Sequence, residues 1–253
     1  MKKWRLLNFS VHQASMNMAI DEAIFRNFEE ENTLRLYGWK PSAVSIGKNQ
    51  CIEEEVDLDS IHRLGFDCVR RISGGGAVFH DEVGELTYSI ITNLQNFKIQ
   101  TIEAVYYEIS RIIFQPLEKI GLNLDYGQIH CPSVFCGGKK ISGNAQARDG
   151  NVVLQHGTIL VKYRPEIMYS VLRARPGRTQ KSMVESVYQH ITTLTNLLKK
   201  DITPQELAEY LLNSLAETDP LQHISGELTS EEKQLALELA STKYGSKEWL
   251  YSR

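Results

Sequence analysis

Two glycine-containing turns in the middle of the chain restrict its fold more than any other feature of the sequence. The first lies within Cys136-Gly137-Gly138-Lys139, and the second lies at Asp149-Gly150, before a β-rich run from Val152 to Val161. Such dipeptides between alternating segments are typical of tight β-hairpins, because these turns need positive φ angles that glycine adopts at little steric cost. The stretch 131–161 therefore predicts neighbouring antiparallel strands.

These strands would bring a thiol and a lysine close together. Cys131 lies before the first turn and Lys140 lies after it. A nucleophile and a cation on a rigid frame are an arrangement suited to covalent acyl transfer. Cys136 is a second candidate nucleophile, but it precedes the turn and is expected to pack. His130 is a candidate base, although in an extended segment it points away from its neighbour Cys131.

Hydrophobic periodicity elsewhere predicts both helices and strands. The helices are predicted at 16–31, 56–64, 101–120, 204–216 and 229–244, and the strands at 33–39, 43–47, 66–71 and 85–92. We expect 33–39 and 43–47 to form a hairpin-like pair, and 85–92 to be a half-buried strand. In the first helix, Asp21 and Glu22 lie opposite the apolar stripe. A long helix after several strands favours an α+β fold, with a mainly helical part from about residue 164.

A run of glycines follows the predicted strand at 66–71. Ser73-Gly74-Gly75-Gly76 has two arginines before it and His80 after it. Consecutive glycines let the backbone approach a phosphate, a carboxylate or a thioester carbonyl closely, but they also occur in plain turns and β-bulges. Neither a P-loop lysine nor a G-x-G-x-x-G context is present, so the run matches no nucleotide fingerprint.

Composition excludes several classes of function. The chain has 253 residues, 42% of them hydrophobic and 23% charged, which is enough for a sizeable core. The formal net charge of -3 gives no reason to expect nucleic acid as a partner. Neither a signal peptide nor an apolar run long enough to span a membrane is recognisable. We therefore expect a cytoplasmic protein with reduced cysteines, no membrane partner and no metal site.

Several separated motifs together resemble one superfamily. RRISGGGAVFHD at 70–81, GKKISGNAQ at 138–146 and LQHG at 154–157 are similar to the lipoate protein ligase and octanoyltransferase superfamily, the biotin/lipoate A/B protein ligase family. Further matches are NMAIDE at 17–22 and the segment 242–249, so the resemblance covers nearly the whole chain. It implies a fold similar to biotin ligases and class II synthetases, with a mixed, largely antiparallel sheet flanked by helices. It also implies residues 1–253 as a single acyl-transfer catalytic domain.

Two branches of this superfamily remain open. The glycine motif is closer to ATP-dependent ligases, but GQIHCPS at 127–133 replaces their usual Asn-Asp pair and places Cys131 where cysteine-dependent octanoyltransferases carry their nucleophile. The favoured hypothesis is transfer of an octanoyl or lipoyl group from a carrier-protein thioester to a lipoyl-domain lysine, through a thioester intermediate on Cys131. The alternative is the catalytic subunit of an ATP-dependent lipoate protein ligase that forms a lipoyl adenylate and needs a separate accessory subunit.

The resemblance also assigns roles to residues, cofactors and partners. The catalytic residues would be Cys131 and Lys140. Substrate would be bound by Arg71, Ser73, Gly74, Gly75, Gly76, His80, Gly143, Asn144, Gln155, His156 and Gly157. The transferase needs no cofactor, whereas the ligase needs ATP and Mg²⁺. The donor would be an acyl carrier protein and the acceptor a lipoyl domain, such as glycine cleavage H protein or a dehydrogenase E2.

A cluster of basic residues is a further candidate surface. Arg173, Arg175, Arg178 and Lys181 surround Pro176-Gly177. This cluster can be read as a docking face for an acidic acyl carrier protein or as an ordinary solvated loop.

Overall fold

The computed structural model describes residues 4–127, 132–218 and 223–253. In these residues the strands are β1 (Trp4–His12), β2 (Asn32–Trp39), β3 (Ala43–Ile46), β4 (Asp67–Arg70), β5 (Val78–His80), β6 (Glu85–Asn93), β7 (Leu124–Tyr126), β8 (Ser133–Cys136), β9 (Lys139–Asp149), β10 (Val152–Leu160) and β11 (His223–Gly226). The helices are α1 (Ala14–Arg26), α2 (Ile52–Glu55), α3 (Leu58–Leu64), α4 (Ile102–Lys119), α5 (Pro165–Val171), α6 (Gln180–His190), α7 (Leu194–Leu198), α8 (Pro204–Thr218), α9 (Ser230–Leu239) and α10 (Lys247–Leu250). A short π-helical turn at Ala240–Tyr244 extends α9.

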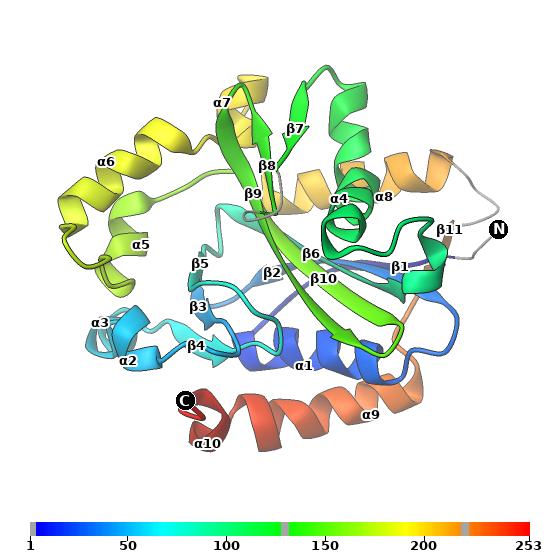
Figure 1. Cartoon of the computed structure of the whole chain (residues 1–253), viewed down its shortest axis with the longest axis horizontal. Coiled ribbons are helices and arrows are strands. Elements are labelled where there is room, and N and C mark those ends of the chain that lie inside the picture. Colours follow the sequence, from blue (N-terminus) through cyan, green and yellow to red (C-terminus); the bar gives the residue numbers. More distant parts are fainter. Residues whose placement is uncertain (1–3, 128–131, 219–222) are drawn as a thin grey trace.

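The larger sheet forms the middle of the molecule (Figure 1). Within the described residues it has eight strands in the order β11-β1-β2-β6-β10-β9-β8-β7. β1 is parallel to both β11 and β2, and the pairs from β2 to β7 are antiparallel. The prediction of a mixed, largely antiparallel sheet flanked by helices is therefore confirmed.

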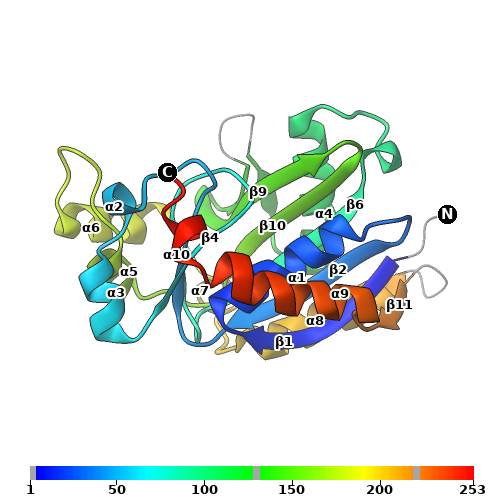
Figure 2. The same ribbon diagram turned by 90° about the horizontal axis from the view of Figure 1, so that it is seen from below.

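Helices cover both faces of this sheet. α4 and α8 lie on one face, and α1 and α9 lie side by side on the other (Figures 1 and 2). Apolar side chains of α4 and α8 pack with those of β2 and β6 in one core cluster, and those of α1 and α9 pack with Ile91 and Leu154 in another. As a result β6 is buried on both faces from Glu85 to Thr92, so the prediction of a half-buried strand is wrong. Its polar side chains bond to other buried groups instead of solvent: Ser89 donates to Asp21 of α1, and Thr92 donates to Asn32 of β2.

A second, smaller sheet stands beside the larger one. Among the described residues its order is β4-β3-β5, and it packs against α2, α3 and α5. The hairpin expected between 33–39 and 43–47 does not form, because β2 pairs with β1 and β6 while β3 pairs with β4 and β5. The chain crosses from one sheet to the other between these strands, and the site described below lies at this junction.

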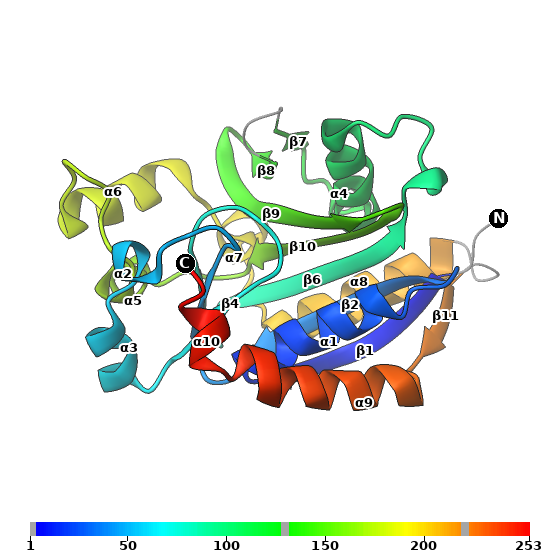
Figure 3. The same ribbon diagram turned by 60° about the horizontal axis from the view of Figure 1, so that its bottom comes forward.

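The end of the chain folds back onto the smaller sheet. Figures 2 and 3 show α10 next to β4. Arg70, at the end of β4, is fully buried and donates hydrogen bonds to the carbonyl oxygens of Trp249 and Leu250. It also donates to the carbonyls of Gly47, Lys48 and Gln50. Arg70 thus ties the C-terminal segment to the loop after β3.

No helix in the described part of the chain is both long enough and apolar enough to cross a lipid bilayer.

Candidate active site

A cavity of about 440 Å³ opens where the two sheets meet. Most of its walls come from β2, β3, β5, β9, β10 and the segment between β4 and β5, and α1, β6 and β8 contribute as well. The predicted site residues that line it are Arg71, Gly75, Gly76, His80, Lys140, Gly143, Asn144, His156 and Gly157. The lining residues that were not among the predicted catalytic and substrate-binding residues are Met18, Tyr37, Trp39, Ser45, Ala77, Val78, Thr87, Pro132, Ser133, Ala145, Thr158 and Arg175.

The glycine loop (Gly74–Gly76) is shaped by Arg71. The Nη2 atom of Arg71 donates to the carbonyl oxygen of Gly74 at 2.8 Å and to that of Gly76 at 2.7 Å. Gly75 has a φ of +92°, which favours glycine. A Cβ atom on Gly47 would lie 2.1 Å from the carbonyl oxygen of Gly75, so the loop after β3 packs directly against it. The carbonyl groups of the glycine loop therefore have a fixed direction.

Lys140 reaches the cavity from a hairpin that the sequence predicted. Gly137 and Gly138 have φ angles of 56° and 74° and join β8 to β9. A bulge between Val134 and Phe135 shifts the pairing of the two strands opposite Lys140; bulges of this kind redirect side chains. The Nζ atom of Lys140 would be 3.0 Å from a Cβ on Gly143, so glycine leaves space for the lysine side chain.

Gly157 gives space in the same way to Asn144. A Cβ on Gly157 would lie 2.1 Å from Oδ1 of Asn144. That oxygen accepts a hydrogen bond from the hydroxyl of Tyr88 at 2.7 Å. Gln155 is fully buried and donates to Tyr88 and to Ser110 of α4, so its side chain lies in the layer between the sheet and α4, outside the cavity lining. Its neighbour His156 points to the opposite face of β10, toward α1.

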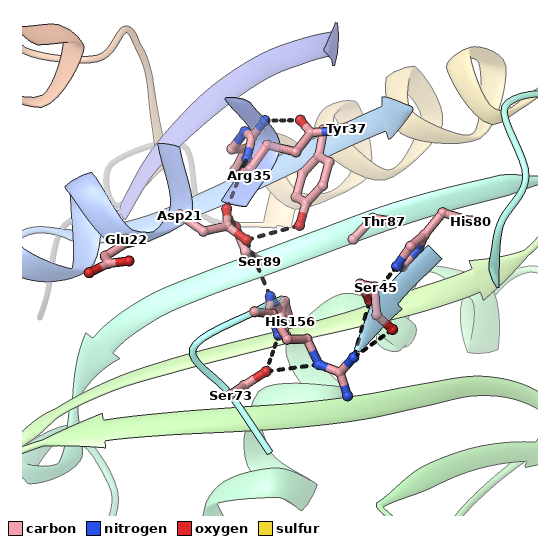
Figure 4. Close-up of polar contacts among 12 residues, drawn as sticks. Asp21, Glu22, Arg35, Tyr37, Ser45, Ser73, His80, Thr87, Ser89 and His156 are labelled. Carbon is pink, nitrogen blue, oxygen red and sulfur yellow. Dashed lines mark hydrogen bonds and ion pairs between the residues drawn. The ribbon is translucent and has the colours of Figure 1, made fainter. Parts of the chain in front are cut away.

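A buried polar cluster lies behind the cavity (Figure 4). Asp21 of α1 accepts hydrogen bonds from Nη1 of Arg35 at 2.9 Å, the hydroxyl of Tyr37 at 2.9 Å and the hydroxyl of Ser89 at 2.8 Å. Burial by itself raises the pKa of Asp21, but the hydrogen bond from His156 and the charge of Arg35 outweigh it and bring the pKa below its usual value. Asp21 is therefore an anion at neutral pH.

The expectation that Asp21 and Glu22 lie on the polar side of a surface helix is wrong. Their exposed fractions are 1% and 2%, because Asp21 faces the strands of the larger sheet and the π-helical turn covers Glu22. Glu22 accepts hydrogen bonds from Lys243 and from the hydroxyl of Tyr244. The signal in the sequence was the pair of adjacent carboxylates within the apolar run from Met18 to Phe25.

Two histidines are hydrogen-bonded to serines that lie next to Arg71. Nε2 of His80 lies 2.8 Å from Oγ of Ser45, and Nε2 of His156 lies 2.6 Å from Oγ of Ser73 (Figure 4). Burial lowers the pKa of His156, and the charge of Arg71 lowers it further. Arg71 is 5% exposed, and burial lowers the pKa of its guanidinium to about 10, so it remains a cation at neutral pH. Ser73 and Gly74 are not part of the cavity wall, but both contact Arg71 directly.

The thiol of Cys131 and the imidazole of His130 lie outside the described residues. Pro132, which follows Cys131 in the sequence, lines the cavity and accepts a hydrogen bond from the backbone N–H of Asn144 at 3.1 Å. Cys136 packs in the core beside α4, and burial raises the pKa of its thiol. Of the cysteines that the structure describes, Cys51, Cys68 and Cys136, none lines the cavity.

The cavity, the glycine loop and the lysine hairpin occur on a framework found in other proteins. The model of the lipoyl protein ligase A/B catalytic domain matches residues 13–216. The chain belongs to this family. Among its relatives in the lipoyl protein ligase A/B family, octanoyltransferase LipM of Kyrpidia tusciae is 33% identical, with 100% of both chains covered. Octanoyltransferase LipM of Clostridioides difficile is also 33% identical, with 98% of both chains covered.

Solved structures of the lipoyl protein ligase A/B family share the whole fold. The bipartite lipoate protein ligase of Thermoplasma acidophilum, described with its E2 lipoyl domain, is 29% identical with a TM-score of 0.85, and 99% of this chain and 97% of that chain are covered. A lipoate-protein ligase A bound with ATP is 29% identical with a TM-score of 0.82, and 99% of both chains are covered.

Proposed function

We propose that this protein is an octanoyltransferase of lipoate assembly. It would transfer an octanoyl or lipoyl group from a carrier-protein thioester to a lysine of a lipoyl domain. Relatives named octanoyltransferase match 98% or more of the chain, which supports this reaction. In this proposal residues 1–253 act as one catalytic domain, and the helical part from about residue 164 belongs to it.

The single observation that carries the proposal is the position of Lys140 relative to Pro132. Both residues line the cavity that Arg71 and the glycine loop border. Pro132 directly follows Cys131 in the sequence, and β8 pairs with the strand that carries Lys140. We therefore assign the nucleophile to Cys131 and the stabilising cation to Lys140.

The proposed reaction has two acyl transfers. The thiolate of Cys131 attacks the thioester carbonyl of the donor, the C–S bond to the carrier breaks, and the carrier thiolate leaves. The amine of the acceptor lysine then attacks the acyl-enzyme, its proton is lost, and Cys131 leaves as a thiolate when the amide forms. In both steps negative charge develops on the carbonyl oxygen, and an ammonium group near that oxygen lowers the barrier. This role falls to Lys140.

The remaining walls of the cavity fit an acyl chain. Met18, Trp39 and Val78 offer apolar surface, while Arg71, His80 and Asn144 offer polar groups. No cofactor enters this reaction. The donor would be an acyl carrier protein, and the acceptor a lipoyl domain such as glycine cleavage H protein or a dehydrogenase E2.

ATP-dependent lipoate ligation is the second candidate. The observation in its favour is the likeness over the full chain to lipoate ligases, one of them bound with ATP. In this case Arg71 and Lys140 would contact the acyl adenylate, ATP and Mg²⁺ would be required, and Cys131 would be dispensable. A separate accessory subunit would then complete the enzyme.

One experiment separates the two candidates. The protein is incubated with octanoyl acyl carrier protein without ATP, and its intact mass is measured. We expect an octanoyl adduct in the wild type and in the control Cys51→Ala, whose thiol lies outside the cavity lining, but no adduct in Cys131→Ala. An adduct that persists in Cys131→Ala contradicts the assignment of the nucleophile. Absence of any adduct, together with lipoate-dependent ATP–pyrophosphate exchange, identifies a ligase.

A further inference from the structure

The guanidinium of Arg71 is held from two sides by buried serine hydroxyls. Its Nη1 atom lies 3.1 Å from Oγ of Ser45, and its Nε atom lies 3.2 Å from Oγ of Ser73. Each of these hydroxyls is in turn hydrogen-bonded to a histidine, Ser45 to His80 and Ser73 to His156. Ser45 and Ser73 are each only 1% exposed, so water does not compete for these contacts.

Each histidine contacts a buried carboxylate through its other ring nitrogen. Nδ1 of His80 lies 2.7 Å from Oε1 of Glu85, and Nδ1 of His156 lies 3.3 Å from Oδ2 of Asp21. The result is two hydrogen-bonded triads that converge on one arginine. They are the His80 triad (Ser45, His80, Glu85) and the His156 triad (Ser73, His156, Asp21).

The chemistry of these groups fixes the direction of every hydrogen bond. An ionised carboxylate only accepts, so Nδ1 of each histidine must carry a proton. In a neutral imidazole Nε2 is then an acceptor, and the serine donates its O–H to it. The lone pairs of the serine remain for the N–H groups of Arg71, which only donate. Every ring nitrogen and every serine hydroxyl in both triads has a partner in this arrangement.

Any other protonation state leaves groups unsatisfied. If Nε2 of His80 carried a proton, Ser45 would face two donors and its own O–H would lose its acceptor. A buried polar group without a partner costs about 1–3 kcal/mol. A proton on Nδ1, with Nε2 as the acceptor, is therefore the arrangement that the hydrogen bonds of both histidines select.

We propose that Ser45, Glu85 and Asp21 are positioning residues of the site, which act through His80, His156 and Ser73 to hold Arg71. Arg71 in turn holds the carbonyl groups of Gly74 and Gly76, and so sets the shape of the cavity wall that faces the substrate. Ser45, Glu85 and Asp21 come from β3, β6 and α1, so three separate parts of the chain control one guanidinium. The inference rests on the proposed function only for its kinetic test.

A serine, histidine and carboxylate in a row also form the machinery of serine nucleophiles. Here each hydroxyl is buried and already accepts a hydrogen bond from Arg71. The ring of His80 is stacked on Trp39 with 3.9 Å between centroids and an angle of 14°, so it has little freedom to move toward a substrate. These contacts favour a holding role over a nucleophilic one.

The first test measures the tautomers directly and needs no substrate. Nitrogen chemical shifts of ¹⁵N-histidine report which ring nitrogen carries the proton, and His80→Gln and His156→Gln assign the signals. We expect Nδ1 of both histidines to carry the proton and Nε2 to accept from the serine. A proton on Nε2 of either histidine overturns the proposal.

The second test removes one hydroxyl at a time. Ser45→Ala and Ser73→Ala should each lower kcat/KM for octanoyl transfer about tenfold, as expected for loss of a hydrogen bond to a charged group. The double variant should lose less than the product of the two, because both changes act on the same guanidinium. Backbone hydrogen exchange at Gly74–Ala77 should become faster in both single variants. Ser60→Ala is the matched control, because this buried hydroxyl accepts from Arg63 away from the cavity.

Failure of the positioning role and failure of the octanoyltransferase proposal give different results in these tests. Wild-type kinetics and unchanged exchange at the glycine loop in both serine variants contradict the positioning role. An acyl adduct on Ser45 or Ser73 contradicts it as well, because it makes the serine a nucleophile. If the wild type transfers no octanoyl group while the tautomers and the exchange rates follow the expectation, the proposed function fails and the positioning role stands.

Discussion

Arg70 and Arg71 are neighbours in the sequence, and both are buried, yet they hold different parts of the molecule. Arg70 donates to backbone carbonyls of the loop after β3 and of α10. Arg71 donates to the glycine loop and to serines that lead to two histidines. In the described part of the chain, neither arginine is within ion-pair distance of a carboxylate. Arg70 thus fixes the C-terminal segment to the smaller sheet, whereas Arg71 orders the residues around the cavity.

The difference lies in what the acceptors can do. Backbone carbonyls do not titrate and do not change partners, so the Arg70 contacts are insensitive to pH. The Arg71 contacts include hydroxyls whose direction depends on which ring nitrogen of His80 and of His156 carries the proton. The contacts of Arg70 with backbone carbonyls are therefore suited to stabilising the fold. The contacts of Arg71 run through serines to histidines, so they are suited to a site that is ordered when those histidines carry their proton on one particular nitrogen.

The largest effect expected from this comparison is on stability. Arg70→Ala removes the donor for several carbonyls and weakens the attachment of α10, so we expect the free energy of unfolding to fall by about 3 kcal/mol or more. Arg71→Ala should lower it less, because Ser45 and Ser73 keep their histidine partners, but it should abolish most octanoyl transfer. Urea denaturation and transfer kinetics on the same two variants measure both quantities. Equal loss of stability in the two variants would remove the distinction between them.

A smaller effect concerns pH. His156 is faced by Asp21 from α1, Arg71 from the segment after β4 and His80 from β5; burial and the latter two groups lower its pKa below 6.5 despite Asp21. Between the pKa of the folded state and pH 6.5, the unfolded chain therefore binds a proton at His156 that the folded protein does not. This contribution to stability is fully present above pH 6.5, and it is lost as the pH falls toward the pKa of the folded state, by at most about 1.4 kcal/mol per pH unit.

The measurement is the free energy of unfolding between about pH 7.5 and about pH 5, a range in which histidine titrates. The wild type should lose more stability on acidification than His156→Gln, which lacks the titrating group. Arg70→Ala, measured under conditions in which it is still partly folded, should show the same change in the free energy of unfolding with pH as the wild type. The reason is that all the acceptors of Arg70 are backbone carbonyls, which do not titrate. Parallel curves for wild type and His156→Gln would show that His156 does not titrate differently in the folded state.

Local patterns were sufficient where the structure depends on neighbouring residues. The turn at Gly137 and Gly138 forms as predicted, with both φ angles positive. The helix predicted from 204 is α8, which begins at Pro204 after Thr203, and the hydroxyl of Thr203 accepts from the backbone N–H of Glu206. Such caps and turns are decided within a few residues, so the sequence alone shows them.

Long-range pairing was not predictable in this way. β1 is an interior strand of the larger sheet, but its partner β11 lies near the other end of the chain, and no local pattern connects them. The same holds for the triads. Asp21 looked like a solvent-facing helix residue, and Ser45 looked like an ordinary strand residue, because their partners come from other elements. The motif around Arg71 was recognised, with Ser73, His80 and His156 among its predicted site residues, but Ser45, Glu85 and Asp21 were not.

Arg175 differs from Arg70 and Arg71, and its substitution should have a smaller effect than theirs. Arg175 lines the cavity mouth but is exposed, and Arg173, Arg178 and Lys181 of the same basic cluster are exposed as well. In the proposed reaction this cluster would meet the acidic surface or the prosthetic phosphate of an acyl carrier protein. Exposed charges act mainly on encounter and are screened by salt, so their contribution is modest.

Arg175→Glu should therefore raise KM for octanoyl acyl carrier protein about threefold to tenfold at low salt, with kcat and the free energy of unfolding nearly unchanged. The effect should shrink as salt is added, because exposed charges are screened over about 8 Å at physiological ionic strength. A small octanoyl thioester without a carrier protein is the control substrate, and its KM should not respond to the substitution if the cluster contacts the protein part of the donor. If both substrates are affected equally, Arg175 contacts the acyl thioester itself and belongs with Arg71. An unchanged KM for both substrates would mean that the basic cluster is an ordinary solvated loop. In that case Arg71 would have a role in the reaction, and Arg175 would have none.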